Sequence, residues 1–415
     1  MIALISFWSA SLLVSAWVLL LSVRYARLIR HRRDNDNAPL YQPRARIVLC
    51  VRGADPFLAR CIACLLDQDY PNFDVRVVVD RAEDPAWPVV AEALRNAPVP
   101  ARMEALSTRS KHRSLKVTSL LQGIADLDES YEVVAIADAD VIANRHWLRD
   151  LVQPLQIQDV GVTTGVRWYI PESSEWGTLI RYMWNCGAEM RRSWFGLAWG
   201  GSMAIRRDVF EAARQGRFWE QSFGEDVPLA ILLRERGHRM EIVPEVIADS
   251  RESIGLMSCI GFISRQLKVV WLYHPYRYAI ALETYGMAAV SAWGAAYLAS
   301  AAWQGDKATF WSVFGALVTL GVSFLVAHFW AEIHVFQIVT SRGGSVWSPV
   351  GAWIGCFLAA PVVPLVNAYA LLQAQLGRRV TWRGIVYRIH NRWSIEIETD
   401  TPYVTNVQGN GKLSA

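Results

Sequence analysis

The stretch VVAIADAD, Val133–Asp140, is a run of β-branched and small apolar residues that ends directly in two aspartates. Such a short apolar run predicts a buried strand over 133–137. Asp138 and Asp140 stand two positions apart at its end and could hold a hard divalent cation against a diphosphate, because Mg²⁺ and Mn²⁺ prefer oxygen ligands and bridge phosphate oxygens. The alternative is a solvated turn, since D-x-D is short enough to occur by chance.

Two further β-branched runs and two amphipathic helical patterns precede this stretch. They lie, in chain order, at 46–51 (RIVLCV, strand), 56–68 (helix), 75–79 (VRVVV, strand) and 115–125 (helix). Strands that alternate with helices are typical of βαβ units, and they predict an α/β fold whose sheet contains parallel strands. Ligands bind beyond the carboxyl ends of such strands, and Asp80 ends the second strand there.

A second acidic pair, Glu225-Asp226, follows Gly224 and opens a helical pattern over 227–236. One interpretation is structural, because acidic side chains in the first turn of a helix are favourable by roughly 0.3–1 kcal/mol through the helix dipole. The other is that the pair supplies a general base that takes a proton from an attacking hydroxyl. The residues alone leave both interpretations open.

Two other features suggest ligand contacts. Gly200 and Gly201 allow the backbone to approach a ligand closely, although paired glycines also simply form turns. Arg265, Lys268 and Trp271 follow i, i+3 and i+6 spacing, which predicts that they share a helical face. The two cations could neutralise a diphosphate and the tryptophan could stack on a sugar. The alternative is an interfacial helix that lies on lipid head groups.

The composition indicates a protein that is partly embedded in a membrane. Of 415 residues, 53% are hydrophobic and only 19% are charged, whereas soluble domains carry about 25% charged residues. The net charge of +4 is small and its basic residues are locally clustered, which argues against nucleic-acid binding. Six scattered cysteines do not form a disulfide pattern, and the lone Cys61-x-x-Cys64 has no second pair at zinc spacing.

Three apolar runs are long enough to cross a membrane, at 2–23, 279–303 and 308–330. Arginines at 24–33 follow the first run, so the positive-inside rule predicts an external N-terminus and a cytoplasmic segment after it. The last two runs are joined by a short polar loop and predict a helical hairpin.

A further apolar stretch at 350–372 is interrupted by Pro361 and Pro364. Strict alternation would place the tail outside, whereas its arginines, Arg383 among them, favour the inside. A re-entrant segment broken at the prolines would reconcile the two, and both possibilities stay open.

In their order, these motifs resemble those of membrane-bound, inverting nucleotide-sugar glycosyltransferases. The likeness is closest to the ceramide glucosyltransferase group and its bacterial relatives, which include hopanoid-associated glycosyltransferases. The matching stretches contain Asp80 (RVVVD), Lys116 (LKVTSL), the D-A-D pair and the E-D pair (FGEDVPLA). Stretches without catalytic roles also match, namely GGSMAIRRDVF, LRERGHRMEIVPEV and TWRGIVYRI. The resemblance runs from Arg46 to His390.

The resemblance implies a GT-A nucleotide-sugar-binding domain, with a mixed, mostly parallel sheet and flanking helices, between transmembrane helices at both ends. It implies a UDP-sugar donor such as UDP-glucose, a ceramide-like or other membrane lipid as acceptor, and Mg²⁺ or Mn²⁺ on Asp138 and Asp140. Asp80, Lys116, Asp138 and Glu225 would bind the nucleotide sugar, and Asp226 would be the catalytic base.

One signature departs from the family pattern. The family's (Q/R)-x-x-R-W reads Arg265-Gln-Leu-Lys268-Val269, and a tryptophan follows only at Trp271. Lysine lacks the bidentate fork of arginine, so Arg265 and Lys268 could still stabilise the diphosphate but with a different geometry. We also expect the tryptophans between the two acidic pairs to line an apolar acceptor entrance; they are Trp168, Trp176, Trp184, Trp194 and Trp199.

The predicted organisation has six parts: an N-terminal transmembrane helix (1–24), a basic juxtamembrane linker (25–45), a cytoplasmic catalytic domain (46–252), interfacial helices (253–278), transmembrane or re-entrant helices (279–375) and a tail (376–415). The lack of long extensions or lumenal cysteine pairs favours a bacterial inner membrane.

Two alternative functions are a processive polysaccharide synthase, for which the apolar runs are few, and an inactive membrane scaffold, for which the intact acidic set is unexpected.

Overall fold

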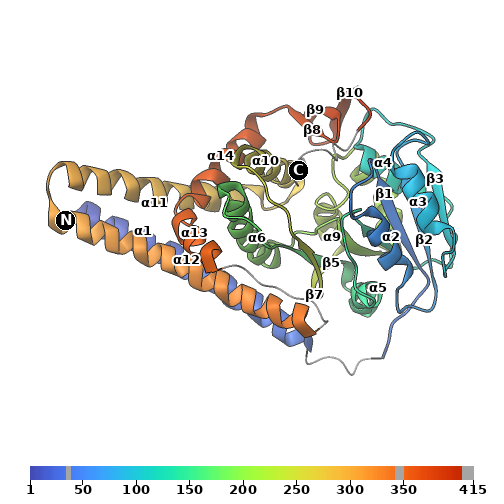
Figure 1. The fold of residues 1–415 in the computed structure, drawn as a ribbon, viewed down its shortest axis with the longest axis horizontal. Helices are drawn as coiled ribbons and strands as arrows, with labels where there is room; N and C mark the ends of the chain where they lie inside the picture. The colour runs from blue at the N-terminus through green and yellow to red at the C-terminus, as the bar shows by residue number, and fades with distance from the viewer. Residues whose placement is uncertain (34–38, 342–349, 404–415) are drawn as a thin grey trace.

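The structure, a computed structural model, describes residues 1–33, 39–341 and 350–403. At its centre is a seven-stranded sheet of order β3-β2-β1-β4-β6-β5-β7 (Figure 1). The pairs β2–β3, β1–β2, β1–β4 and β5–β7 are parallel, whereas β6 is antiparallel to both β4 and β5. The expected α/β fold with a mixed, mostly parallel sheet is therefore confirmed. The strands are β1 (Ala45–Val51), β2 (Phe73–Val79), β3 (Ala101–Ala105), β4 (Val133–Ala137), β5 (Val160–Tyr169), β6 (Ser202–Arg206) and β7 (Arg239–Ser250).

Helices cover both faces of this sheet because its central strands are apolar on both sides. In β1, Ile47 and Leu49 pack toward one set of helices, while Val48 packs toward the other. The first set is α2 (Leu58–Leu66), α3 (Ala86–Leu94) and α5 (Trp147–Val152), followed by a short 3₁₀ turn (Gln153–Gln156). The second set is α4 (Leu115–Gly123), α7 (Arg207–Arg214), α8 (Arg217–Glu220) and α9 (Leu229–Arg236).

The remaining helices form a bundle beside the sheet, and three of them project well beyond it (Figure 1). The projecting helices are α1 (Ile2–Arg33), α11 (Arg277–Trp303) and α12 (Lys307–Ser341). The others are α6 (Trp176–Phe195), α10 (Leu256–Tyr273), α13 (Val350–Ala359) and α14 (Val363–Leu376). Helix α6 belongs to the central segment but packs on α1, α10 and α13, and so it joins the sheet to the bundle.

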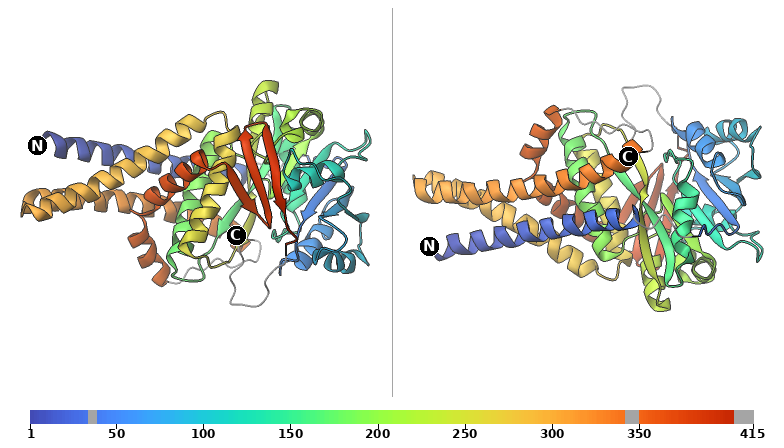
Figure 2. Two further views of the ribbon diagram at one scale, coloured as in Figure 1. Left: turned by 90° about the horizontal axis from the view of Figure 1, so that it is seen from above. Right: turned by 90° about the horizontal axis from the view of Figure 1, so that it is seen from below.

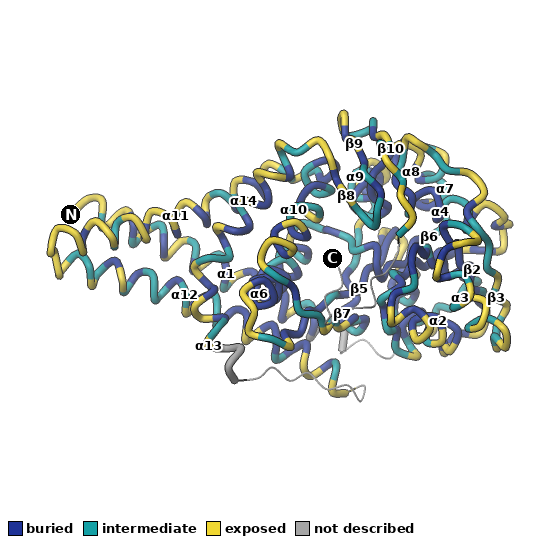
Figure 3. Tube along the Cα trace, turned by 45° about the horizontal axis from the view of Figure 1, so that its top comes forward, coloured by how far each residue is buried: buried dark blue, intermediate teal, exposed yellow. Residues whose placement is uncertain are grey.

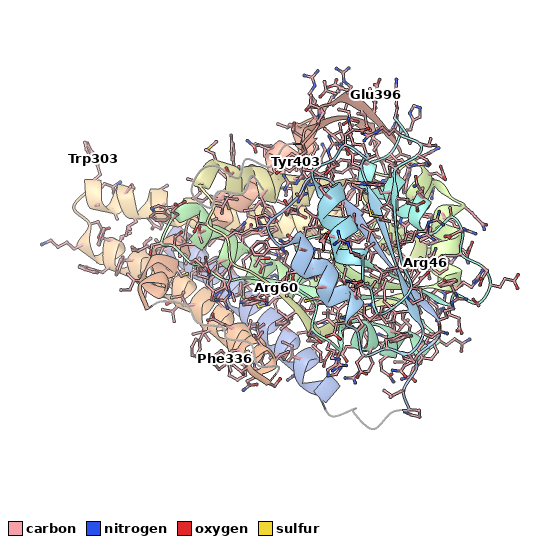
Figure 4. The ribbon with its side chains drawn as sticks, turned by 45° about the vertical axis from the view of Figure 1, so that its right-hand side comes forward. Arg46, Arg60, Trp303, Phe336, Glu396 and Tyr403 are labelled. Atoms are coloured by element: carbon pink, nitrogen blue, oxygen red, sulfur yellow. The ribbon has the colours of Figure 1, made fainter. Side chains whose placement is uncertain are left out.

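The outer parts of the bundle expose apolar side chains. Figure 3 shows exposed residues along the projecting ends, and Figure 4 shows Trp303 at the tip and Phe336 pointing away from α12. Two helices are long and apolar enough to cross a membrane, over Ile2–Ile29 and Lys307–Ser341, and only 28% of the most apolar part of each is buried. Helix α11 forms as predicted but is not one of these two.

A second, three-stranded antiparallel sheet follows the bundle. Its strands are β8 (Arg379–Trp382), β9 (Ile385–Asn391) and β10 (Ser394–Asp400). It lies between α10 and the first half of the large sheet (Figure 2), where Tyr387 packs on Phe223 with ring centroids 5.1 Å apart. The described part of the tail and the large sheet therefore lie together, at the same end of the projecting helices.

Most expected elements form close to their predicted bounds, with three differences. Helix α1 continues to Arg33, so residues 25–33 are helical and not part of a linker. The 350–372 stretch forms two helices, α13 and α14, separated at the expected prolines. The strands β8–β10 were not predicted, because their short alternating runs carry many charged side chains.

Candidate functional site

A single cavity begins at the carboxyl ends of β1 and β4 and continues between α6, α10, α11 and α14. Its volume is about 590 Å³, within the range of small-molecule sites. One end is polar and is lined by Lys116, Asp138, Asp140, Arg167, Gly200, Gly201, Glu225 and Asp226. The other end lies among the helices, where Trp184, Phe262 and Ile280 line it together with polar and charged side chains, among them Thr284, Asn367, Arg181, Glu189 and Arg191.

Asp138 and Asp140 lie at the polar end, directly after β4. Asp138 Oδ1 accepts a hydrogen bond from Lys116 Nζ at 2.6 Å, and Asp140 Oδ2 accepts one from Arg167 Nη2 at 2.6 Å. The other carboxylate oxygen of each aspartate receives no hydrogen bond from the residues that the structure describes. Each aspartate thus keeps one oxygen for a ligand while a neighbouring cation fixes its orientation.

Lys116, on the first turn of α4, joins the two acidic pairs. Its Nζ lies 2.6 Å from Asp138 Oδ1 and 2.5 Å from Glu225 Oε1. Burial by itself would lower the pKa of Lys116, but the attraction of Asp138 and Glu225 raises it well above its usual value. Burial likewise opposes ionisation of Asp138, yet Lys116 brings the pKa of this carboxyl below its usual value.

Glu225 and Asp226 lie just before α9 and differ in their surroundings. Glu225 is buried, and burial raises its pKa, as do the nearby charges of Asp226 and Asp138, although Lys116 opposes this. Asp226 is half-buried; its Oδ2 accepts a hydrogen bond from the Gly200 amide at 2.9 Å and its Oδ1 accepts one from the Val227 amide at 2.6 Å. Backbone amides therefore fix the orientation of the Asp226 carboxylate in the cavity wall.

Gly200 and Gly201 make close approach of the acidic side chains possible. A Cβ on Gly200 would lie 2.0 Å from Glu225 Oε1, and a Cβ on Gly201 would lie 2.4 Å from Asp138 Oδ2. Any side chain here would displace the carboxylates, so the paired glycines belong to the site and are not only a turn.

Asp80 follows β2 as predicted but does not line the cavity. It is 2% exposed, and its Oδ2 accepts hydrogen bonds from Arg52 Nη1 at 2.8 Å and from Arg81 Nε at 3.2 Å, while Arg109 contacts Oδ1. Arg52 does line the cavity and also contacts Asp400 of the tail at 2.9 Å. In this structure Asp80 therefore reaches the cavity wall only through Arg52.

The structure separates Arg265, Lys268 and Trp271, which were expected to share a face. Arg265 lines the cavity, but Lys268 Nζ donates to the carbonyl oxygen of Ala374 at 2.6 Å, at the end of α14. Trp271 packs on Tyr278 instead, with ring centroids 5.6 Å apart. At 3.6 residues per turn, positions i, i+3 and i+6 spread over about 120° of the helix, which is too wide for one contact surface.

The tryptophan cluster is also divided. Trp184 and Trp199 line the cavity, whereas Trp168 is buried, Trp176 is 50% exposed and Trp194 packs on Trp17 of α1. The expectation that all five line one entrance is wrong, because α6 turns its tryptophans in different directions.

Sequence reasoning missed six cavity arginines: Arg52, Arg167, Arg181, Arg191, Arg192 and Arg383. Two of them matter most for the polar end, Arg167 on β5 and Arg383 in the β8–β9 turn. A single cation within the apolar run of β5 was one available signal for Arg167. For Arg383 the signal was the Arg-Gly pair within TWRGIVYRI, which is typical of a turn between two strands.

The polar end suits a divalent cation that also binds a diphosphate. Within the described residues, no group of three His, Cys, Asp or Glu side chains could hold a metal ion, the Cys61–Cys64 region included. Mg²⁺ sites commonly use one or two carboxylates and take further ligands from substrate phosphates and water. Asp138 and Asp140, with one oxygen each available, fit such a donor set.

Solved structures with similar folds include the mannosyltransferase PcManGT from Pyrobaculum calidifontis, in complex with GDP-Man and Mn²⁺. It is 17% identical, with a TM-score of 0.47, over 89% of this chain and 99% of that one. Glucosyl-3-phosphoglycerate synthase from Mycobacterium tuberculosis is 13% identical, with a TM-score of 0.38, over 55% of this chain and 79% of that one. The sequence profile of glycosyl transferase family 21 matches residues 8–395, nearly the whole chain. The protein therefore belongs to glycosyl transferase family 21 and is a glycosyltransferase.

Proposed function

We propose that this protein transfers a single sugar from a UDP-hexose, such as UDP-glucose, to a hydroxyl of a membrane lipid, with inversion at the anomeric carbon. The observation that carries the proposal is the two-ended cavity. Its acidic and cationic end suits a nucleotide diphosphate, and its other end lies among the helices of the bundle, where Trp184, Phe262 and Ile280 offer apolar surface to an acceptor. Donor and lipid acceptor would meet where the two ends join.

Asp226 is the general base in this proposal. It is the more accessible member of the E-D pair, and its two amide hydrogen bonds hold it in the cavity wall. It takes the proton of the acceptor hydroxyl as that oxygen bonds to the anomeric carbon. The bond from this carbon to the phosphate oxygen breaks on the opposite face, and the nucleoside diphosphate leaves.

The leaving group develops negative charge, which cations in the wall stabilise. A divalent cation on Asp138 and Asp140 would supply Lewis-acid stabilisation of the diphosphate. Lys116 keeps Asp138 ionised and oriented for this purpose. Arg265, whose guanidinium makes no hydrogen bond or ion pair to another described residue, lines the cavity and is free to pair with a phosphate. Asp80 would act on the nucleoside through Arg52.

The end of the cavity among the helices suits the acceptor, because Trp184, Phe262 and Ile280 there can contact its hydrocarbon part. A smaller cavity, of about 50 Å³, lies next to it between α1, α6, α11, α12 and α14, and both cavities are lined by Trp184, Arg191, Thr284 and Asn367. The exposed apolar surfaces of α1 and α12 support insertion of these helices in a bilayer. The acceptor would then reach the site from the membrane side, with Arg191 near its polar head.

The test is expression of the protein in membranes, incubation with a panel of UDP-sugars and Mn²⁺, and mass spectrometry of the lipid extract. We expect one lipid class to gain the mass of a single hexose. A ladder of polymer lengths would favour a processive synthase instead. If no UDP-sugar of the panel supported either sugar transfer or donor hydrolysis, the proposal would be overturned.

A further inference from the structure

Arg383 occupies the tip of the β8–β9 hairpin, in a strained backbone conformation. The hairpin turn consists of Arg383 and Gly384, with φ angles of 44° and 79°. Two left-handed residues are typical of the type I′ turns that join adjacent strands. Asparagine or glycine is common at the first position, whereas arginine is disfavoured there by its Cβ. Residues with strained backbone conformations are common at ligand sites, so an arginine at this turn position suggests a functional role for its side chain.

The surroundings of Arg383 hold its side chain at the cavity. Arg52 Nε donates to the Arg383 carbonyl oxygen at 2.9 Å, and the Arg383 guanidinium donates in return to the Arg52 carbonyl oxygen and to Asp55. The turn is thereby fixed to the end of β1, and Arg383 lines the cavity. Two of the five N–H groups of the guanidinium are used in these contacts, so the others remain for a ligand.

Carboxylates match only some of the arginines at this part of the cavity: Asp140 pairs with Arg167 and Asp55 pairs with Arg383. Arg167, Arg265 and Arg383 all line it, and Arg265 has no anionic partner among the described residues. Burial lowers the pKa of Arg265, and the charges of Arg383 and Arg167 lower it further, although Tyr169 opposes this. A cluster of guanidiniums that repel one another is favourable only when an anion binds among them, and arginine suits phosphate through its paired donors.

The location along the cavity identifies which part of the donor is bound. Arg383 contacts Arg52, which holds Asp80 beyond the end of β2. Asp140 of the proposed cation site lines the same cavity as Arg383. Burial lowers the pKa of the Arg383 guanidinium, but the charges of Asp55 and, to a lesser extent, Tyr403 and Asp140 raise it above its usual value. Arg383 therefore lines the cavity that holds the proposed cation site and contacts Arg52 of the proposed nucleoside end, and the diphosphate would join these two parts.

We propose that Arg383 binds the diphosphate of the nucleotide-sugar donor, a contact that the sequence motif assigns to Arg265 and Lys268. Lys268 is directed to the end of α14 and does not line the cavity, so the hairpin supplies the cation that the degenerate motif lacks. The three-stranded sheet of the tail then completes the donor site. This inference rests on the proposed function, because it takes a nucleoside diphosphate as part of the substrate.

The test compares UDP with uridine, which lacks the phosphates. Full-length wild type, Arg383→Asn and Arg383→Gly are titrated in lipid nanodiscs with Mg²⁺, by calorimetry for UDP and by ligand-observed NMR for uridine. Asn and Gly both tolerate the left-handed turn, so the hairpin should be kept. We expect roughly 10- to 100-fold weaker binding of UDP, because a charge-assisted hydrogen bond is lost, and unchanged binding of uridine. Arg383→Lys should recover part of the affinity.

The matched control is Arg379→Asn, which removes an exposed arginine of the same hairpin that pairs with Glu398; its UDP affinity should equal that of the wild type. Equal UDP affinity of Arg383→Asn and wild type would overturn the inference and leave the proposed function standing. Parallel losses for UDP and uridine would show a structural role and would also overturn it. A wild type that did not bind UDP would overturn the proposed function, and this inference with it.

Discussion

The ammonium nitrogen of Lys116 lies 2.6 Å from Asp138 Oδ1, and this contact holds the first aspartate of the D-A-D pair ionised in a buried site. The pKa of Lys116 is raised, so its contribution to stability is complete below its usual pKa of 10.5 and is lost only as the pH rises through the higher folded value. The pKa of Asp138 is lowered, so its contribution is present above 3.8 and is lost as the pH falls through the lower folded value. The pair is therefore intact across the neutral range.

Lys116→Met should move the acid limb of the donor kcat/KM profile to higher pH. Removing the cation lets burial and the remaining carboxylates raise the pKa of both Asp138 and Glu225. An opposite charge at this distance shifts a carboxyl pKa by about one to three units. We therefore expect the acid limb of the profile to move by about one pH unit or more. Release of UDP measured from pH 5 to 9 checks this. Lys111→Met, at an exposed lysine, serves as the control; an acid limb in the same place for both variants would contradict the prediction.

Asp226→Asn should bind donor normally and lose turnover. The amide oxygen can still accept one of the two hydrogen bonds from Gly200 and Val227, which reach different oxygens of Asp226, but the NH2 group that replaces the other oxygen accepts none and the side chain cannot take a proton. Loss of a general base costs about 10²–10⁴-fold in rate. Single-turnover kinetics and UDP titration separate the two properties, with Asp159→Asn at the surface as the control. Turnover near the wild-type rate would rule out Asp226 as the base.

Gly201→Ala should reduce activity without unfolding the protein. Its Cβ would lie 2.4 Å from both Asp138 Oδ2 and the Trp199 ring, so the carboxylate must move. Gly261→Ala on α10 is the matched control, because nothing lies within 4 Å of its Cβ. We expect at least a roughly tenfold loss of kcat/KM for Gly201→Ala, since displacement of a reacting group by about 1 Å can cost 10²-fold, and no loss for Gly261→Ala. Equal activities would show that the acidic site tolerates the added methyl group.

Trp184→Ala should raise the KM for the lipid acceptor and leave the KM for the donor unchanged. Trp184 lines both cavities, and its Nε1 donates to Asn367 Oδ1 at 2.8 Å. Loss of a buried side chain removes about 1.5–3 kcal/mol of apolar burial, or roughly 10- to 100-fold in affinity. Trp184→Phe, which keeps most of the apolar volume, should have an intermediate effect. Trp176→Ala removes an exposed tryptophan of the same helix and should have none; matching effects of the two alanine variants would argue against the acceptor path.

Removal of divalent cations should abolish sugar transfer reversibly. Each of Asp138 and Asp140 keeps one oxygen without a hydrogen bond from a described residue, as a cation site requires. Dialysis against EDTA followed by addition of Mn²⁺ is the measurement. Asp140→Asn should need a higher Mn²⁺ concentration for half-maximal activity, because one anionic ligand is lost. Full activity in EDTA would exclude the metal.

Strands and helices with strong hydrophobic periodicity were predictable from local sequence. The runs that form β1, β2 and β4 are short, mostly apolar segments rich in β-branched residues, and the aspartates that follow β2 and β4 were found by position alone. The strands β8–β10 were not predictable in this way, because their alternating apolar runs are short and their outer faces are charged. Burial of Tyr387 and Ile389 against Phe223 and α10 makes them a sheet, and that contact is remote in sequence.

By itself, the sequence determined the acidic centre: the D-A-D and E-D pairs, the paired glycines and Lys116 all lie together as expected, because strand ends and helix starts bring them to one edge of the sheet. Tertiary structure decided which cations face that centre. Lys268 is turned toward α14 by helical rotation, while Arg167 comes from a buried strand and Arg383 from a turn 245 residues after Asp138. The periodicities of helices and strands are local properties of a chain. The packing of a C-terminal hairpin against β1 depends on burial over long sequence separations, and no local pattern contains that information.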